Sequence, residues 1–101
     1  MKVIDSLAAG WFLCEDGDDL LLDVNCSHSA FGYSWMIKLT KSEKNEYQEK
    51  GRAYIEYLAK EVSNSSPGVK ESVSIYRDRN VSKLYSDKLS NAIKAWKNQV
   101  K

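Results

Sequence analysis

The residues best suited to chemistry in this sequence are a run of acids, one histidine and two cysteines. The run Asp16-Gly17-Asp18-Asp19 superficially resembles a calcium loop, but the later ligands of such a loop, above all a bidentate Glu at position twelve, are missing. Asp-Gly is also a common hairpin turn. A turn needs only one such pair, so the additional carboxylates leave two interpretations open: a solvated turn, or an acidic patch that binds a partner.

His28, the only histidine, lies between two serines and could act as a general base. No nucleophile or second acid stands at a matching position, so we predict no catalytic role for it. Cys14 precedes Glu15 and Asp16, whose charges raise a thiol pKa and make it a poor nucleophile. One histidine and two scattered cysteines lack the spacing of a zinc site. We therefore expect no enzyme, no metal and no cofactor.

Alternation of apolar and polar residues predicts strands in the first 39 residues. The expected strands cover 11–15, 20–26 and 31–39, with turns at 16–19 and 27–29. Pairing Val24 with Phe31, and Leu22 with Tyr33, brings the apolar side chains of the last two strands onto one face. These strands should form an antiparallel meander.

The cysteines test this arrangement. Pairing Leu13 with Leu22 across the acidic turn places Cys14 and Cys26 on opposite faces of the sheet. They cannot then form a disulfide, and we expect both to be reduced, as in a cytoplasmic protein.

Helices are expected in the second half of the chain. Thr40 and Glu43 form a capping box for a helix that should end near Ser63. Its predicted apolar face is Tyr47, Gly51, Tyr54, Ile55, Leu58, Ala59 and Val62. A short fourth strand is expected around Val73 and Ile75. Ser86 can cap a last helix, whose apolar stripe is Leu89, Ala92, Ile93, Trp96 and Val100.

Together these elements predict a single α+β domain over residues 1–101, in the order βββαβα. It combines an antiparallel sheet of three or four strands with two amphipathic helices. The second face of the sheet carries Phe12, Cys14, Leu21 and Met36. Either the last helix covers this face, or the face is exposed to a partner.

Charge is distributed unevenly, although the net charge is only +1. Residues 1–37 hold six acids and one lysine, a local net charge of −5. No stretch has the length and composition of a membrane span, and the N-terminal residues do not read as a signal peptide. The sequence thus favours a cytoplasmic protein.

Three stretches, LDVNCSHSAFGYSWMIKLT, EYQEKGRAYIEYLAKEV and RNVSKLYSDKLSNAIKAWK, cover most of the chain. In size, order and character it resembles the small immunity proteins of bacterial contact-dependent growth inhibition and related polymorphic toxin systems. The resemblance implies a cytoplasmic protein that binds the C-terminal domain of a cognate toxin, often a nuclease, and blocks it. It implies no catalytic residue.

We predict that the partner-binding residues are Asp16, Asp18, Asp19 and Asp23, which would meet a basic surface of the toxin. The alternative is a small nucleic-acid-binding regulator that uses the basic second half, in which Arg77, Arg79 and the helical lysines could contact phosphates. A minor enzyme or a subunit of a larger assembly is a third possibility.

Overall fold

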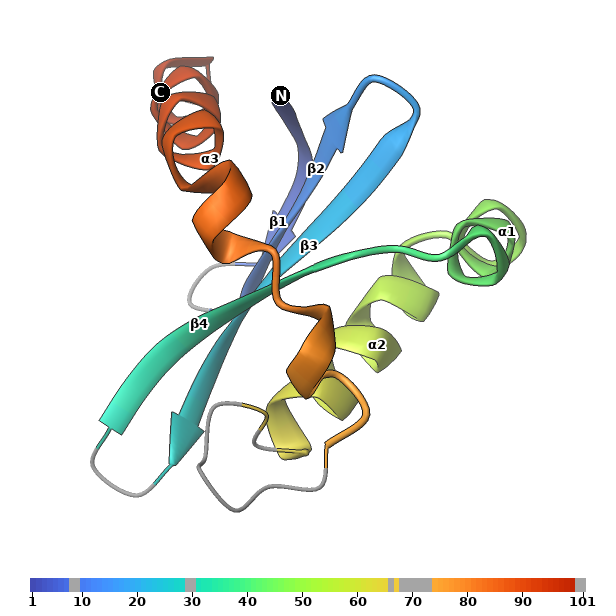
Figure 1. Cartoon of the computed structure of the whole chain (residues 1–101). Helices are drawn as coiled ribbons and strands as arrows, with labels where there is room; N and C mark the ends of the chain where they lie inside the picture. The colour runs from blue at the N-terminus through green and yellow to red at the C-terminus, as the bar shows by residue number, and fades with distance from the viewer. Residues whose placement is uncertain (8–9, 29–30, 66, 68–73, 100–101) are drawn as a thin grey trace.

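The computed structural model has four strands followed by helices (Figure 1). It describes residues 1–7, 10–28, 31–65, 67 and 74–99. The strands are β1 (Lys2–Leu7), β2 (Trp11–Asp16), β3 (Asp19–His28) and β4 (Phe31–Lys38). They form one antiparallel sheet in the order β1-β2-β3-β4. The expected α+β class with an antiparallel sheet is confirmed.

The helices are α1 (Lys41–Lys50), α2 (Arg52–Asn64), the 3-10 turn η1 (Arg77–Arg79) and α3 (Ser82–Gln99). The capping box of Thr40 and Glu43 is present at the start of α1, as predicted. The single helix expected up to Ser63 is wrong, because Gly51 divides it. Gly51 has φ 65° and ψ −145°, a conformation that essentially only glycine adopts without strain.

The start of α3 also differs from the prediction. Ser86 lies inside the helix, which begins one turn earlier at Ser82. The side chain of Asn80 accepts a hydrogen bond from the Ser82 amide at 2.8 Å and so satisfies a free donor at the helix start. The predicted apolar stripe does face the sheet at Leu89, Ala92, Ile93 and Trp96, whereas Val100 lies outside the described residues.

The fourth strand is β1, at the N-terminus, so the predicted order βββαβα is wrong in that detail. Val73 lies outside the described residues, and Ile75 lies in a turn with 77% of its surface exposed. The register of β1 shifts between Val3 and Asp5, where a bulge interrupts the pairing with β2. Since a bulge breaks the alternation of faces, the apolar residues of β1 do not show the pattern of a strand.

The pairing of β2 with β3 is as predicted, with Leu13 opposite Leu22. The predicted register between β3 and β4 is wrong: Val24 pairs with Trp35 rather than Phe31. The two strands continue to His28 and Phe31, because backbone pairing does not require apolar side chains at the strand ends. The shift is by an even number of residues, so the predicted faces are kept.

Each face of the sheet carries its own core. One core joins Leu13, Leu22 and Ile37 to the buried residues of α2. The other joins the second face to α3, and its members are Val3, Cys14, Leu21, Met36 and Ala92, with Phe12, Leu89, Ile93 and Trp96 packed against them. The last helix therefore covers the second face. Figure 1 shows α2 and α3 on opposite sides of the sheet.

Among the described residues, no helix has the length and apolar composition that crossing a bilayer requires.

Candidate partner-binding site

The acidic residues around the β2–β3 turn form a projecting hairpin end, which we call the acidic tip: Glu15, Asp16, Asp18 and Asp19. Asp16, the last residue of β2, is paired with Asp19, the first residue of β3. Gly17, at φ 63°, supplies the positive φ that this tight turn needs. The predicted turn at 16–19 is thus present, and three of the four proposed binding residues lie together.

The Asp16 side chain contacts two elements outside the hairpin, the helix α3 and the N-terminus. Its carboxylate lies 3.3 Å from the Lys88 ammonium of α3 and 3.5 Å from the N-terminal amine. The hydrogen bond from Lys88, together with these two positive charges, lowers the pKa of Asp16. Asp16 therefore holds the tip in place and is less available to a partner than the prediction required.

Asp18 and Asp19 are directed differently. The carboxylate of Asp18 has no ion-pair partner among the described residues, although its backbone carbonyl accepts a hydrogen bond from Lys44 of α1 at 3.0 Å. The carboxylate of Asp19 lies 3.3 Å from Lys38, and both side chains are a little under half exposed, so this pair is weak and exchangeable. These two acids are the part of the tip that a partner can reach.

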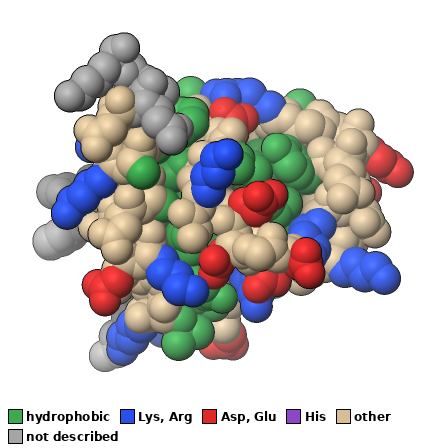
Figure 2. Space-filling model, turned by 90° about the horizontal axis from the view of Figure 1, so that it is seen from above, with side chains coloured by type: hydrophobic (Ala, Val, Ile, Leu, Met, Phe, Trp, Pro, Cys, Tyr) green, Lys and Arg blue, Asp and Glu red, His purple; other side chains and the backbone are tan. Residues whose placement is uncertain are grey.

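A cleft of about 460 Å³ separates the tip from α1. Its walls carry Glu15, Asp18 and Asp19 on one side and Lys41, Lys44, Asn45 and Gln48 on the other, with Ile4, Leu20 and Tyr47 below. The space-filling view of the molecule from above shows acidic and basic side chains interspersed on this face rather than one large patch of a single sign (Figure 2). Recognition here would depend on the local arrangement of charges.

Asp23 does not belong to the acidic tip, contrary to its grouping in the prediction. It lies in the middle of β3, opposite Phe12 and Met36, on the face that α3 covers. Only 8% of its surface is exposed, and burial raises its pKa. Asp23 and the tip are therefore separate features.

The cysteines lie on opposite faces of the sheet, as predicted, and both are buried free thiols. Burial, reinforced by the charge of Asp23, raises the pKa of Cys14 to about 12. A thiol in this state is a poor nucleophile. The backbone of His28 pairs with that of Phe31, and the structure does not describe the His28 side chain.

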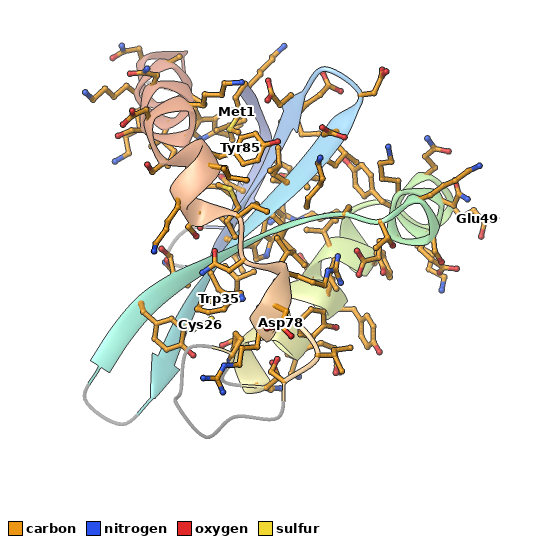
Figure 3. The ribbon with its side chains drawn as sticks, in the orientation of Figure 1. Met1, Cys26, Trp35, Glu49, Asp78 and Tyr85 are labelled. Carbon is orange, nitrogen blue, oxygen red and sulfur yellow. The ribbon has the colours of Figure 1, made fainter. Side chains whose placement is uncertain are left out.

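Several basic residues of the second half make ion pairs within the chain. Arg79 donates to both carboxylate oxygens of Glu43, and Arg52 reaches Asp5 at 2.6 Å and Glu56 at 3.0 Å. Figure 3 shows Glu49 at the outer side of α1, pointing away from the body of the fold, and Asp78 in η1 is also exposed. Arg52 and Arg79 thus connect elements of the fold, a role that the sequence pattern did not reveal.

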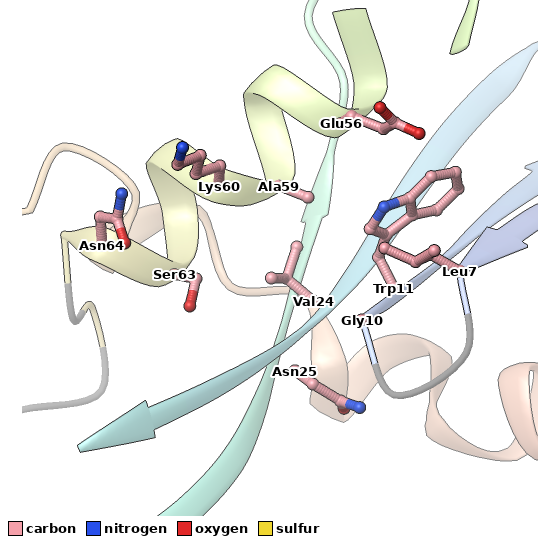
Figure 4. A pocket seen from close by; sticks show the side chains of 10 residues that line it. All are labelled: Leu7, Gly10, Trp11, Val24, Asn25, Glu56, Ala59, Lys60, Ser63 and Asn64. Atoms are coloured by element: carbon pink, nitrogen blue, oxygen red, sulfur yellow. The ribbon is translucent and has the colours of Figure 1, made fainter. Parts of the chain in front are cut away.

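A second cleft, of about 390 Å³, runs between α2 and the far end of the sheet (Figure 4). Trp11 and Val24 form its apolar side, and Glu56 and Lys60 belong to the helix above. The Arg52 guanidinium lies 5.0 Å from the centre of the Trp11 ring, a cation–π distance. Sequence reasoning missed this cleft, because its two walls come from segments about 40 residues apart.

Among the described residues, no group of three His, Cys, Asp or Glu side chains is arranged to hold a metal ion. Comparison with known protein families, with curated proteins and with solved structures found no match to this chain.

Proposed function

We propose that this chain is a bacterial immunity protein that binds a cognate toxin domain in the cytoplasm and neutralises it. The acidic tip would contact a basic surface on that domain, with Asp18 and Asp19 as the main contacts and Glu15 beside them. The resemblance described above suggests the class of protein. The geometry of the tip supports a binding role and suggests where the contact lies.

The observation that carries the proposal is that the tip ends a paired hairpin, and that its Asp18 carboxylate has no ion-pair partner among the described residues while the Asp19 pair is weak. Asp16 contacts Lys88 of α3 and the N-terminal amine, and Lys44 of α1 donates a hydrogen bond to the turn, so several contacts besides the strand pairing limit the conformations of the tip. A preorganised group loses less conformational entropy on binding than a mobile one. The outward acids can therefore enter a basic cleft without disturbing the two cores.

A nuclease is the toxin activity that fits this surface best. Nucleases bind a phosphate backbone through clefts lined by Lys and Arg. A rigid pair of carboxylates would compete for the same cations and would also speed association through electrostatic steering. The proposal gives the immunity protein no catalytic step.

The nucleic-acid regulator is supported less well. Arg52 is paired with Asp5 and Glu56, and Arg79 with Glu43, so these two arginines are not freely available to phosphates. A regulator that used them would have to break these contacts. Measurement of RNA and DNA binding against salt concentration separates the two functions, because phosphate contacts give a steep loss of affinity with salt.

The proposal is tested by co-expressing the chain with the C-terminal domain of the protein encoded beside its own gene, which the proposal takes to be the toxic domain. Cells should grow when both are produced and stop growing when the toxic domain is produced alone. The matched variants are Asp18→Asn/Asp19→Asn, which should protect poorly, and Glu49→Gln/Asp78→Asn, which removes two charges elsewhere and should protect fully. Growth arrest despite the wild-type chain, at equal expression and with the chain folded, would contradict the proposal.

A further inference from the structure

A small pocket lies between β3, β4 and the first half of α3. Its volume is about 190 Å³. Asp23 and Ser34 come from the sheet, and the helix adds a row of hydroxyls from Ser82, Ser86 and Ser90. The serines of α3 recur every fourth residue, which places them along one side of the helix. We call this cavity the Asp23 pocket.

Two polar groups in its wall have no partner. The carboxylate of Asp23, on a residue more than nine-tenths buried, makes no hydrogen bond or ion pair with any described residue. The hydroxyl of Ser82 is also buried without a hydrogen-bond partner in the described structure. Buried polar groups are nearly always satisfied in native proteins, and a buried charge left alone is especially costly. The Ser82 hydroxyl is fully buried and the Asp23 carboxylate lines the cavity beside it, so one donor group bound in the cavity would satisfy both.

We propose that the Asp23 pocket binds an alkylammonium group, and that in the complex with the toxin domain this group is the side chain of a partner lysine. The identification of the occupant rests on the proposed function. The three N–H donors of an ammonium would be shared between the Asp23 carboxylate, the Ser82 hydroxyl and a neighbouring serine. Its methylene chain would pack against Met36, Leu89 and Ile93, which form the apolar part of the wall.

The size of the pocket favours a side chain over a small-molecule ligand. Its volume of about 190 Å³ lies below the roughly 300 to 1,000 Å³ that is usual for small-molecule sites. An ammonium is a compact point charge, whereas a guanidinium is a wide planar fork suited to bidentate pairing. A lysine matches a single carboxylate surrounded by hydroxyls.

The position of the pocket also suits the proposed partner. Alternate residues of a strand point to the same side, so Asp19 of the tip and Asp23 lie on the same face of β3. Four residues of strand separate them by roughly 14 Å. Lys88 of α3 contacts Asp16 of the tip, while the serines on another side of the same helix line the pocket, so a partner that reaches both sites would pack across α3.

The pocket is tested without any toxin by titrating the protein with n-butylammonium and following the backbone amide signals by NMR. Saturable shifts should centre on Asp23, Ser82 and Ser86, with a dissociation constant on the order of 1 mM. Asp23→Asn should weaken binding by about tenfold or more, the value of one hydrogen bond to a charged group. Asp18→Asn, an equal loss of charge outside the pocket, should leave the affinity unchanged, and n-butyrate should not bind.

A second variant, Ser86→Phe, fills the mouth of the pocket and keeps the carboxylate, so it should also abolish the shifts. Absence of saturable shifts, or equal affinity of Asp23→Asn and the wild type for n-butylammonium, would rule out ammonium binding in the Asp23 pocket. Micromolar binding of the free amine would overturn the lysine as occupant in favour of a small amine. An Asp23→Asn chain that binds the toxin domain and protects cells as well as the wild type would do the same. Failure of the toxin to bind the wild-type chain, with amine binding intact, would instead refute the proposed function.

Discussion

At the scale of single residues, burial decides the chemistry of the two thiols. Cys14 and Cys26 are buried in different cores, and burial raises the pKa of both. Their separation by the sheet was predictable from the alternation of strand residues, because the pairing of Leu13 with Leu22 fixes both faces.

We predict that neither thiol reacts with a thiol reagent in the native protein at pH 8, and that both react at once in denaturant without prior reduction. In the native protein the thiols should react only as fast as the whole chain unfolds, since the thiolate is both disfavoured and inaccessible in the native state. The reaction is followed by absorbance of the released product. A single thiol that reacts rapidly in the native state would show that one of the cores is open.

Asp23 is the other residue for which burial has a measurable consequence. Its pKa is raised above the ordinary value of 3.8, so the folded state holds the proton more tightly than the unfolded state. As pH rises from the unfolded-state pKa of Asp23 to its folded-state pKa, Asp23 lowers the free energy of unfolding. Above the folded-state pKa this destabilisation is fully present. The penalty disappears below the unfolded-state value.

Asp23→Asn should therefore be more stable than the wild type at pH 7 to 8, by roughly 1 kcal/mol, because the buried unpaired charge is gone. The difference should shrink as the pH falls toward 4. Urea denaturation of both proteins across this range measures it, with Asp18→Asn as the exposed control. A destabilised Asp23→Asn at neutral pH would show that the carboxylate has a favourable partner.

At the scale of elements, the places where sequence reasoning failed have identifiable causes. The bulge after Val3 hides β1, because apolar residues on either side of it no longer alternate. The helical pattern from Tyr47 to Val62 continues across Gly51, so periodicity alone did not indicate a break there. Capping chemistry at Thr40 was predictable because it depends on two side chains close in sequence.

A substitution at Gly51 tests the break between α1 and α2. Gly51→Ala should lower the free energy of unfolding by about 1 to 3 kcal/mol, the usual cost of a residue held in a glycine-only backbone conformation. An added Cβ would meet nothing within 4 Å, so the cost comes from the backbone and not from a clash. Chemical denaturation measures it.

Gly32→Ala is the matched control, since its Cβ would make only one ordinary contact at 3.9 Å and its φ is not positive. It should change stability much less. Equal stability of Gly51→Ala and the wild type would mean that α1 and α2 can join into the continuous helix that the sequence pattern suggests.

At the scale of the whole molecule, the sequence predicted the class of fold, the acidic hairpin and the two apolar faces. It did not predict how the charges are used. Asp16 binds Lys88 from 72 positions further along the chain, and Asp23 lies in a pocket walled by serines of α3. Such contacts depend on where α3 crosses the sheet, which no local pattern specifies.

In the proposed complex, the outward carboxylates of the acidic tip recognise a basic toxin domain. The most direct measurement is the affinity of the purified toxin domain for the wild type and for Asp18→Asn/Asp19→Asn, by titration calorimetry at low and high salt. We predict that the double variant folds normally and binds the toxin domain about tenfold or more weakly at low salt, because charge-assisted contacts are lost. The difference should narrow at high salt, and the control Glu49→Gln/Asp78→Asn should bind like the wild type. Equal affinity of the wild type and the tip variant at both salt concentrations would contradict the account.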